Sequence, residues 1–445
     1  MLDKTNNPIK LKKSKYAFFI ENQNNELIIY HSITGFILLC SEMDYIEKAK
    51  SVEKNEIIYL DKEDDFISLL YKKGVLLNIE FDETCQVRQM YEENVLHRKE
   101  LLITLIVTRQ CNFRCVYCGQ KHENKKMPKS TYDSIINFIE KMCNTYQYKS
   151  ISVSFFGGEP LLEYDNIVYF LEKLKDYSNK KHILYSAGMT TNGYLLTPEK
   201  FMKLSDLGCL DYQITLDGME SSHNKKRFLI GKKPTWKTIV NNLMYIKSTN
   251  VNFSISLRTN FDTTVLENIE EYFDFVSSNL KDDRILLYYE TIKNHGNIEQ
   301  KEYISNVEAV FSNVAISKLL REKGLKSSIV YHSTLPYCSM CRAGIPSFYV
   351  VDYDSSLKKC THRLDSEINR IGYLHLDGTA TINNNLNSKW VYNDYLSHPE
   401  CNTCKLLPLC FGKRCPVCYV DKTLSFGCDQ ELKVAEMEEI ISAHI

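Results

Sequence analysis

The chain has 445 residues, with 55 Lys or Arg and 56 Asp or Glu, so its net charge is close to −1. This balance favours neither nucleic acid nor an anionic membrane as a partner, and no apolar run reaches the roughly 18 residues that a membrane-spanning helix needs. The first residues, "MLDKTNNPIKLKKSK", lack the apolar core of a signal peptide, which predicts a cytoplasmic protein.

Residues 1–98 are predicted to form a small α+β domain. The runs "YAFFIEN" and "ELIIYHS" indicate two strands around a polar turn. The run "EDDFISLLYKKGVL" indicates a helix that ends at Gly74. The charged stretch "EFDETCQVRQMYEENVLHRKE" is interpreted as a linker to the next domain.

Residues 99–330 alternate between strand and helix patterns. One predicted helix has a Ser130/Thr131 cap, and another begins with Thr197 and Pro198 and ends at Gly208. Repeated βα units predict a parallel sheet or an incomplete barrel. In such folds the chemistry lies at the carboxyl ends of the strands. The runs "CNFRCVYC", "FGGEP", "TTNG" and "TLDG" all follow predicted strands, so they are expected at one face.

Sixteen cysteines are unusual for a chain of this length. In a reducing compartment, clustered cysteines more often bind metals than form disulfides. Four cysteines stand singly, and each is predicted to be a small buried hydrophobe: Cys40, Cys85, Cys143 and Cys209. Three fall between positions 111 and 118, and nine between 338 and 428. The sequence therefore predicts two separate metal-binding regions.

Cys111, Cys115 and Cys118 have the spacing C-x3-C-x2-C. Four thiolates ligate every iron of a [4Fe–4S] cluster, so three leave one iron open. Catalytic metal sites keep such an open position for a substrate or cofactor. A zinc ion with a distant fourth ligand, or with His122 as that ligand, is the alternative.

The run "CNFRCVYC" resembles the cysteine motif of radical SAM enzymes. "GGEP", "TNG", "TLDG" and "HNKKR" match further motifs of that family in the same order, across about residues 100 to 290. The resemblance implies a partial (β/α)6 TIM-like barrel. It also implies a [4Fe–4S] cluster on the three cysteines and an S-adenosylmethionine whose reductive cleavage yields a 5′-deoxyadenosyl radical.

The resemblance implies a set of cofactor-binding residues: Tyr117, Gly157, Gly158, Glu159, Asn192, Thr215 and Arg227. Glu159 is expected near the amino group of S-adenosylmethionine, and Arg227 near its carboxylate. A purely structural role is the alternative, because Asn192-Gly193 and Asp217-Gly218 are also residue pairs typical of turns. His223 and Arg227 can equally share one face of a short helix.

Residues 331–445 are predicted to be a loop-rich, cysteine-rich domain with little regular structure. The nine cysteines there resemble the SPASM extension of radical SAM enzymes, which holds two auxiliary [4Fe–4S] clusters. The resemblance implies two ligand sets: Cys338, Cys341, Cys360 and Cys415 for one cluster, and Cys401, Cys404, Cys410 and Cys428 for the other. The gap between Cys410 and Cys415 is one residue longer than in the family, so Cys418 is spare or replaces Cys415. A zinc ribbon built on two C-x2-C pairs is the alternative.

The same resemblance suggests a maturase that cross-links a ribosomally made (RiPP) peptide through a thioether or carbon–carbon bond. The first domain is then expected to bind the peptide's leader by strand addition, and a flavodoxin or ferredoxin to supply electrons. Three alternatives are a formylglycine-generating sulfatase maturase, a catalytically silent iron–sulfur peptide-binding protein, and an enzyme of small metabolites. In the sulfatase maturases an Asp follows the cysteine that matches Cys360, where this chain has Thr361 and His362.

Overall fold

The computed structural model describes residues 9–60, 63–292, 304, 306–328, 334–337, 339–392, 399–412, 415–421 and 428–444. The chain divides into two compact units. The first unit comprises residues 1–98, 330–344 and 392–445, and the second comprises residues 99–329 and 345–391. Within the described ranges, no helix has the length and apolar character required to cross a membrane.

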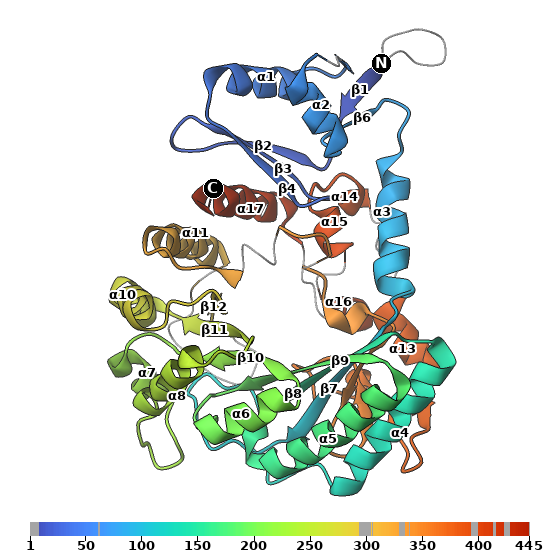
Figure 1. Ribbon diagram of the computed structural model, residues 1–445, viewed down its shortest axis with the longest axis vertical. Helices are drawn as coiled ribbons and strands as arrows, with labels where there is room; N and C mark the ends of the chain where they lie inside the picture. Colours follow the sequence, from blue (N-terminus) through green and yellow to red (C-terminus); the bar gives the residue numbers. More distant parts are fainter. Residues whose placement is uncertain are drawn as a thin grey trace. The chain divides into compact units, whose positions relative to one another are not determined.

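The second unit is built on a ten-stranded sheet with the order β12-β11-β10-β9-β8-β7-β13-β14-β15-β16. Its first six strands in the chain are parallel: β7 Glu100–Thr108, β8 Ser150–Gly157, β9 Leu184–Thr191, β10 Cys209–Thr215, β11 Ser254–Phe261 and β12 Ile285–Thr291. These strands alternate with helices, so the predicted partial (β/α)6 barrel is confirmed (Figure 1).

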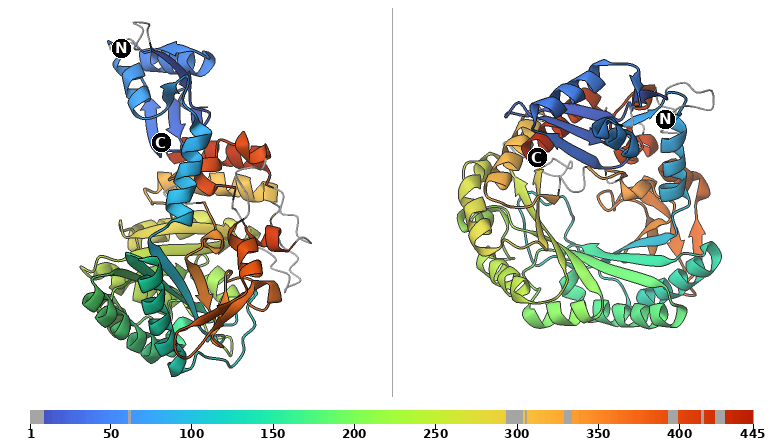
Figure 2. Two further views of the ribbon diagram at one scale, coloured as in Figure 1. Left: turned by 90° about the vertical axis from the view of Figure 1, so that its right-hand side faces the viewer. Right: turned by 45° about the horizontal axis from the view of Figure 1, so that its top comes forward.

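The helices of the second unit connect these strands and lie along the outer side of the curved sheet (Figure 2). They are α4 Lys129–Tyr146, α5 Tyr164–Lys181, α6 Pro198–Asp206, α7 Glu220–Lys226, α8 Trp236–Ser248, α9 Thr263–Leu266 and α10 Ile269–Asn279. Two more helices of this unit come later in the chain: α11 Asn306–Glu322 after β12, and α13 Asn384–Val391 after the last strand of the sheet. Burial alternates along β8, where Phe155 packs on Phe170 of α5 while Ser152 and Ser154 on the other face are half-buried. Because side chains alternate across a strand, Ser152 and Ser154 lie on the inner face of the sheet, opposite the face that packs on α5.

Of two N-terminal helix caps predicted from the sequence, one is confirmed and one is wrong. Thr197 accepts a hydrogen bond from the backbone N–H of Lys200 and caps α6, as predicted. The predicted Ser130/Thr131 cap is wrong, because α4 begins one residue earlier, directly after Pro128. Thr131 therefore lies inside the first turn, and its hydroxyl bonds to Ser355 at 3.1 Å.

The predicted loss of regular structure after residue 331 is wrong for residues 348–382. This segment adds four strands to the large sheet: β13 Phe348–Val351, β14 Ser356–Lys358, β15 Arg370–Leu374 and β16 Ala380–Ile382. Strand β13 pairs in parallel with β7, with Val351 opposite Leu105, and its four residues are all buried. The short apolar run "FYVV" therefore forms a fully buried strand.

The first unit has two three-stranded sheets, with the orders β5-β1-β6 and β2-β3-β4. The strands are β1 Lys10–Lys13, β2 Ala17–Glu21, β3 Leu27–His31, β4 Phe36–Cys40, β5 Ile58–Tyr59 and β6 Leu76–Asn78. The helices near them are α1 Met43–Lys54, α2 Asp65–Lys72 and α3 Glu83–Tyr91. The two predicted strands and the end of α2 before Gly74 are confirmed.

The predicted linker contains a helix instead. Asp82 caps α3 by accepting hydrogen bonds from the backbone N–H groups of Thr84 and Cys85. A π-helical turn, Glu92–Leu96, continues it. Cys85 is exposed rather than buried, and its thiol donates to Asp82 at 3.2 Å. The other three single cysteines are buried, as predicted: Cys40, Cys143 and Cys209.

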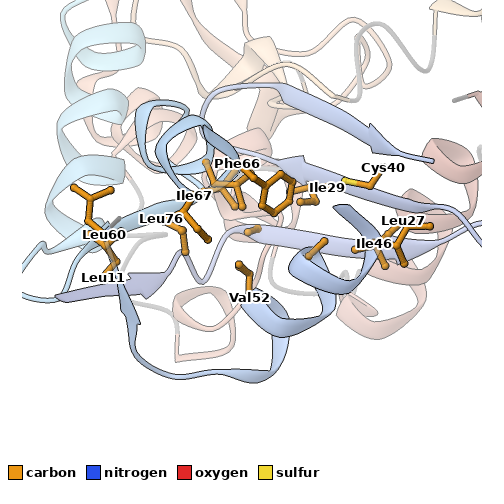
Figure 3. Close-up of a cluster of buried hydrophobic side chains, with 14 residues drawn as sticks. Leu11, Leu27, Ile29, Cys40, Ile46, Val52, Leu60, Phe66, Ile67 and Leu76 are labelled. Carbon is orange, nitrogen blue, oxygen red and sulfur yellow. The ribbon is translucent and has the colours of Figure 1, made fainter. Parts of the chain in front are cut away.

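Sheet β2-β3-β4 is covered on both faces within the first unit. One face packs on α1 and α2, where Ile29, Val52 and Phe66 belong to one apolar cluster (Figure 3). The other face packs on the cysteine-rich C-terminal segment, including α15 Leu407–Cys410 and α17 Gln430–His444. The N-terminal sheet and the C-terminal cysteines therefore share a hydrophobic core. Two further short helices lie in that segment, α14 Pro399–Asn402 and α16 Val417–Val420.

Candidate cofactor site

The three clustered cysteines lie in a loop that leaves the carboxyl end of β7. The loop is held along residues 226–230 by backbone hydrogen bonds from Arg114 to Phe228, from Val116 to Lys226 and from Ile230 to Asn112. The N–H of Phe113 donates to the sulfur of Cys111 at 3.3 Å. The loop is therefore fixed by the segment that follows α7, although more than 100 residues separate the two in sequence.

The thiols of this loop influence one another. Burial raises the pKa of Cys111 to about 12, and Glu159, Cys115 and Cys118 raise it as well. Burial raises the pKa of Cys115 to about 11, whereas the Arg227 guanidinium acts to lower it. Because metals bind the thiolate, loading this site releases protons.

His122 was the possible fourth ligand if the three cysteines bound zinc instead of an iron–sulfur cluster. The imidazole of His122 lies 3.7 Å from the sulfur of Cys118. In the described part of the chain, no three His, Cys, Asp or Glu side chains are close enough to enclose one metal ion. Three thiols in one loop, with the buried Arg227 guanidinium near Cys115, fit an iron–sulfur cluster ligated by thiolates.

Two glycines bring "GGEP" against the residues that precede Cys111. The N–H of Gly158 donates to the carbonyl of Thr108, and that of Glu159 donates to Gln110 at 2.7 Å. A Cβ atom on Gly158 would lie 1.9 Å from the Gln110 oxygen, and one on Gly157 would lie 2.2 Å from the Thr108 oxygen. Only glycine permits this backbone approach.

Glu159 is fully buried and accepts three hydrogen bonds from the protein. One carboxylate oxygen accepts from the N–H of Leu161 at 3.0 Å and from the hydroxyl of Thr191 at 2.7 Å. The other accepts from the N–H of Asn192 at 2.7 Å. Burial raises the pKa of Glu159, and the bonds from Asn192 and Thr191 oppose that rise. The carboxylate thus joins "GGEP" to the "TTNG" turn, a role the sequence did not reveal.

Asn192 continues this connection to the cysteine loop. Its amide nitrogen donates to the side-chain oxygen of Asn112 at 2.8 Å and lies 3.9 Å from the sulfur of Cys111. Its own side-chain oxygen accepts from the N–H of Tyr194. Three of the predicted motifs therefore meet at the carboxyl ends of β7, β8 and β9.

Tyr117 lies at the centre of a second buried network. Its hydroxyl donates to Asp217 and accepts from Arg227 at 2.8 Å and from the amide of Asn260 at 3.1 Å. The other Asp217 oxygen accepts from the N–H of Asn260 at 2.7 Å. Sequence reasoning missed Asn260, whose only signal is a polar residue at the end of a strand. Thr215, also predicted, is the last residue of β10 and is buried.

His223 fixes the backbone of Arg227. The N–H of Asp217 donates to Nδ1 of His223 at 3.1 Å, so Nε2 carries the proton and bonds to Thr235. The Thr235 hydroxyl donates in turn to the carbonyl of Arg227 at 2.7 Å. Burial lowers the pKa of His223 well below its usual range, so the ring is neutral. The histidine therefore acts as a structural support for Arg227.

Two buried donors in this region lack a hydrogen-bond partner in the described structure: Nε of Arg227 and the side-chain amide nitrogen of Asn112. Nε of Arg227 lies 3.9 Å from Asp217. An arginine N–H without a partner near the Cys115 thiol suits a ligand carboxylate. The predicted S-adenosylmethionine residues and the cysteine triplet thus form one continuous site.

The C-terminal cysteines fall in both units. Cys360 belongs to the second unit, whereas Cys341 and Cys415 belong to the first, and Cys338 lies outside the described residues. In the first unit, Cys404 and Cys410 are buried. The pKa of Tyr419 is raised by burial and by four neighbouring thiols, those of Cys401, Cys418, Cys410 and Cys428. The structure therefore brings Cys418 near members of the second predicted ligand set.

Comparison with known proteins identifies the core of this site. Residues 105–276 match the model of the radical SAM superfamily. The chain contains a radical SAM domain. Such a domain carries a [4Fe–4S] cluster and S-adenosylmethionine, which the three cysteines and their neighbours fit.

Related proteins and structures extend beyond the radical SAM domain to different degrees. The radical SAM cyclopropyl synthase TigE of Paramaledivibacter caminithermalis is 27% identical over 223 residues, which are 43% of this chain and 46% of that protein. The GTP 3′,8-cyclase of Nautilia profundicola is 27% identical over 52% of this chain and 66% of that protein. The solved structure of native anSMEcpe with bound AdoMet and the Cp18Cys peptide has a TM-score of 0.60 at 17% identity, covering 77% of this chain and 96% of that one. The match to TigE spans about half of that protein's length.

Proposed function

We propose that this protein is a radical SAM maturase that modifies a ribosomally made precursor peptide, forming a thioether or carbon–carbon cross-link. The observation that carries the radical chemistry is the junction of the cysteine loop with "GGEP", the "TTNG" turn and Arg227. A peptide substrate is supported by the anSMEcpe structure, which contains a peptide.

In this proposal the chain's own residues bind and orient the cofactors. Cys111, Cys115 and Cys118 would hold the cluster, and Gly157 and Gly158 let the "GGEP" turn pack on the residues that precede Cys111. Arg227 would bind the carboxylate of S-adenosylmethionine, and its guanidinium is held in place by Tyr117 and Asp217. When bound, the two cofactors supply a one-electron cleavage and a radical that removes hydrogen from the substrate. A flavodoxin or ferredoxin is the proposed electron donor.

Eight of the nine C-terminal cysteines are proposed to hold two auxiliary clusters in the ligand sets given above, with Cys418 spare or in place of Cys415. Support for an ordered ligand comes from Cys360. Its backbone N–H donates to the side chain of Asn369 at 2.8 Å, and the amide of Asn369 donates back to its carbonyl at 2.8 Å. The N–H of His362 donates to its sulfur at 3.4 Å. A sulfur that accepts a backbone N–H is typical of thiolates that bind iron–sulfur clusters.

The first domain is proposed to bind the leader of the peptide. Strand β4 is at the edge of sheet β2-β3-β4, and β3 is its only partner among the described strands. An extended peptide can add to such an edge through main-chain hydrogen bonds. The residues around β4 are half-buried and apolar, including Ile37 and Leu39.

The test is a mass spectrum of a Cys-containing peptide encoded beside the gene, after incubation with reconstituted enzyme, S-adenosylmethionine and a reductant. Loss of two hydrogens per event is expected, and it should vanish in Cys115→Ala but persist in Cys143→Ala, which removes a buried thiol of α4. Loss of the peptide's sulfur would indicate formylglycine formation instead. Formation of 5′-deoxyadenosine with an unchanged peptide would refute the peptide class, and no 5′-deoxyadenosine would refute radical chemistry.

A further inference from the structure

A buried cluster of charges lies outside the cofactor site just described. Asp352 follows β13, is fully buried, and accepts hydrogen bonds from two cations. Nε and Nη2 of Arg109 donate to its two oxygens at 3.3 and 2.6 Å. Nζ of Lys358 donates to it at 2.5 Å. Both cations are only 5% exposed.

The two cations belong to the two cysteine-bearing segments of the second unit. Arg109 is two residues before Cys111, at the entry to the cysteine loop. Lys358 ends β14, two residues before Cys360. Strand β13 lies between β7 and β14 in the sheet, so a carboxylate at its end is placed to reach both.

Further contacts extend the connection beyond these three side chains. Lys358 also donates to the carbonyl of Leu364 at 2.5 Å, which folds the segment after Cys360 back toward Asp352. Asp365 then lies 3.4 Å from Arg109 and 3.6 Å from Lys121. The exposed pairs of Asp365 add little, because solvent screens them. The buried bonds of Asp352 carry the connection.

Asp352, Arg109 and Lys358 are buried charges, and each is stable in the interior only while its charged partners are present. Removing the shared carboxylate leaves two buried cations without their common acceptor, which is far more damaging than loss of a surface pair. Sites that act together on one substrate also need fixed relative positions.

We propose that Asp352 is a positioning residue that couples the loop of Cys111–Cys118 to the segment of residues 360–365. Neutralising it releases both segments, whereas removing one cation releases only the segment to which that cation belongs. The catalytic meaning of this coupling rests on the proposed function, in which both segments hold clusters. The coupling itself is a property of the folded chain.

The test is hydrogen exchange of the full-length protein before iron loading, read at residues 110–118 and 360–365. Asp352→Asn should speed exchange in both segments by about tenfold, the effect of losing a charge-assisted hydrogen bond. Lys358→Met should speed it only at residues 360–365. The matched control is Asp354→Asn in the same turn, whose carboxylate accepts only from Ser356 among the hydrogen bonds described, and it should leave both segments unchanged.

Equal effects of Asp352→Asn and Asp354→Asn, or a change in only one segment with Asp352→Asn, would overturn the proposal. If Asp352→Asn does not fold, Lys358→Met and Arg109→Gln provide the test. Lys358→Met must speed exchange only at residues 360–365, and Arg109→Gln only at residues 110–118. Faster exchange in both segments with either variant would overturn the coupling. A second readout is S-adenosylmethionine cleavage without peptide, where Asp352→Asn should raise KM several-fold and Lys358→Met should not. If the wild-type protein cleaves no S-adenosylmethionine, the proposed function fails while the exchange pattern still tests the coupling.

Discussion

The buried carboxylate of Glu159 accepts a hydrogen bond from the backbone N–H of Asn192 at 2.7 Å. The two residues follow adjacent parallel strands, β8 and β9, and the bond joins two motifs that are 33 residues apart. Since Glu159 also bonds to Thr191 and Leu161, it is the main connection between these turns.

Glu159→Gln should therefore destabilise the second unit by about 3 kcal/mol, because the new NH2 group faces a donor and leaves buried N–H or O–H groups unsatisfied. Urea-induced unfolding, followed by circular dichroism, measures this. The neighbouring Glu163→Gln is the control, since Glu163 accepts only a partly exposed bond from Asn166 in the described structure. Equal stability of the two variants would contradict the structural role of Glu159.

Gly158→Ala should prevent proper assembly of the cysteine loop, because the added Cβ would lie 1.9 Å from the carbonyl oxygen of Gln110. We expect loss of most of the iron bound at the triplet, measured as iron and sulfide per chain after anaerobic reconstitution. Gly231→Ala is the control: its Cβ meets no atom within 4 Å, and its positive φ of 87° costs only about 1 kcal/mol. Full iron content in Gly158→Ala would show that the loop tolerates a shifted backbone.

Tyr117→Phe should weaken binding of S-adenosylmethionine by about tenfold, since Arg227 loses its 2.8 Å partner while the aromatic ring is kept. Equilibrium binding to the reconstituted protein measures this, with the absorbance of the cluster as a check on loading. Tyr132→Phe is matched, because its buried hydroxyl has no hydrogen-bond partner within the described residues. An unchanged affinity in Tyr117→Phe would mean that Asp217 alone orients Arg227.

Ile28 and Ile29 are fully buried neighbours on β3 that face opposite sides of the sheet. Each change to Ala should cost about 3 kcal/mol of folding free energy. Before iron loading, only Ile28→Ala should also speed labelling of the Cys404 thiol, because Ile28 and Cys404 belong to the same apolar cluster. Thiol labelling followed by peptide mapping distinguishes the two. Similar labelling of Cys404 in both variants would argue against a core shared with the C-terminal segment.

Burial lowers the pKa of His31 from 6.5 to about 4, although a backbone bond at Lys73 acts in the opposite direction. The unfolded chain therefore binds a proton at higher pH than the folded chain. Stability of the first unit should be full above pH 6.5 and should fall by about 3 kcal/mol as the pH drops toward 4.

His31→Gln should flatten this pH dependence, because glutamine can bond to Ser14 and Thr34 but does not titrate. Urea unfolding at several pH values between 4 and 7 measures it, and His97→Gln at an exposed position is the control. The same pH slope in His31→Gln as in the unaltered protein would assign the effect to other groups.

The amino-acid sequence alone predicts the alternating βα core, the order of the motifs and their place after strands. Those features follow from local rules: apolar periodicity, cap residues, glycine in turns and the spacing of Cys111, Cys115 and Cys118. The close approach at Gly157 and Gly158 agrees with that local reading, since only a residue without Cβ fits there.

Only the tertiary structure shows which distant groups complete the site. Asn260 bonds to Tyr117 from 143 residues away, and Asp352 bonds to Arg109 from 243 residues away. The place of the strands of residues 348–382 in the large sheet and the second covered face of β2-β3-β4 likewise depend on distant partners. Their positions depend on burial and on partners brought together by the fold, whereas periodicity and spacing describe only neighbours along the chain.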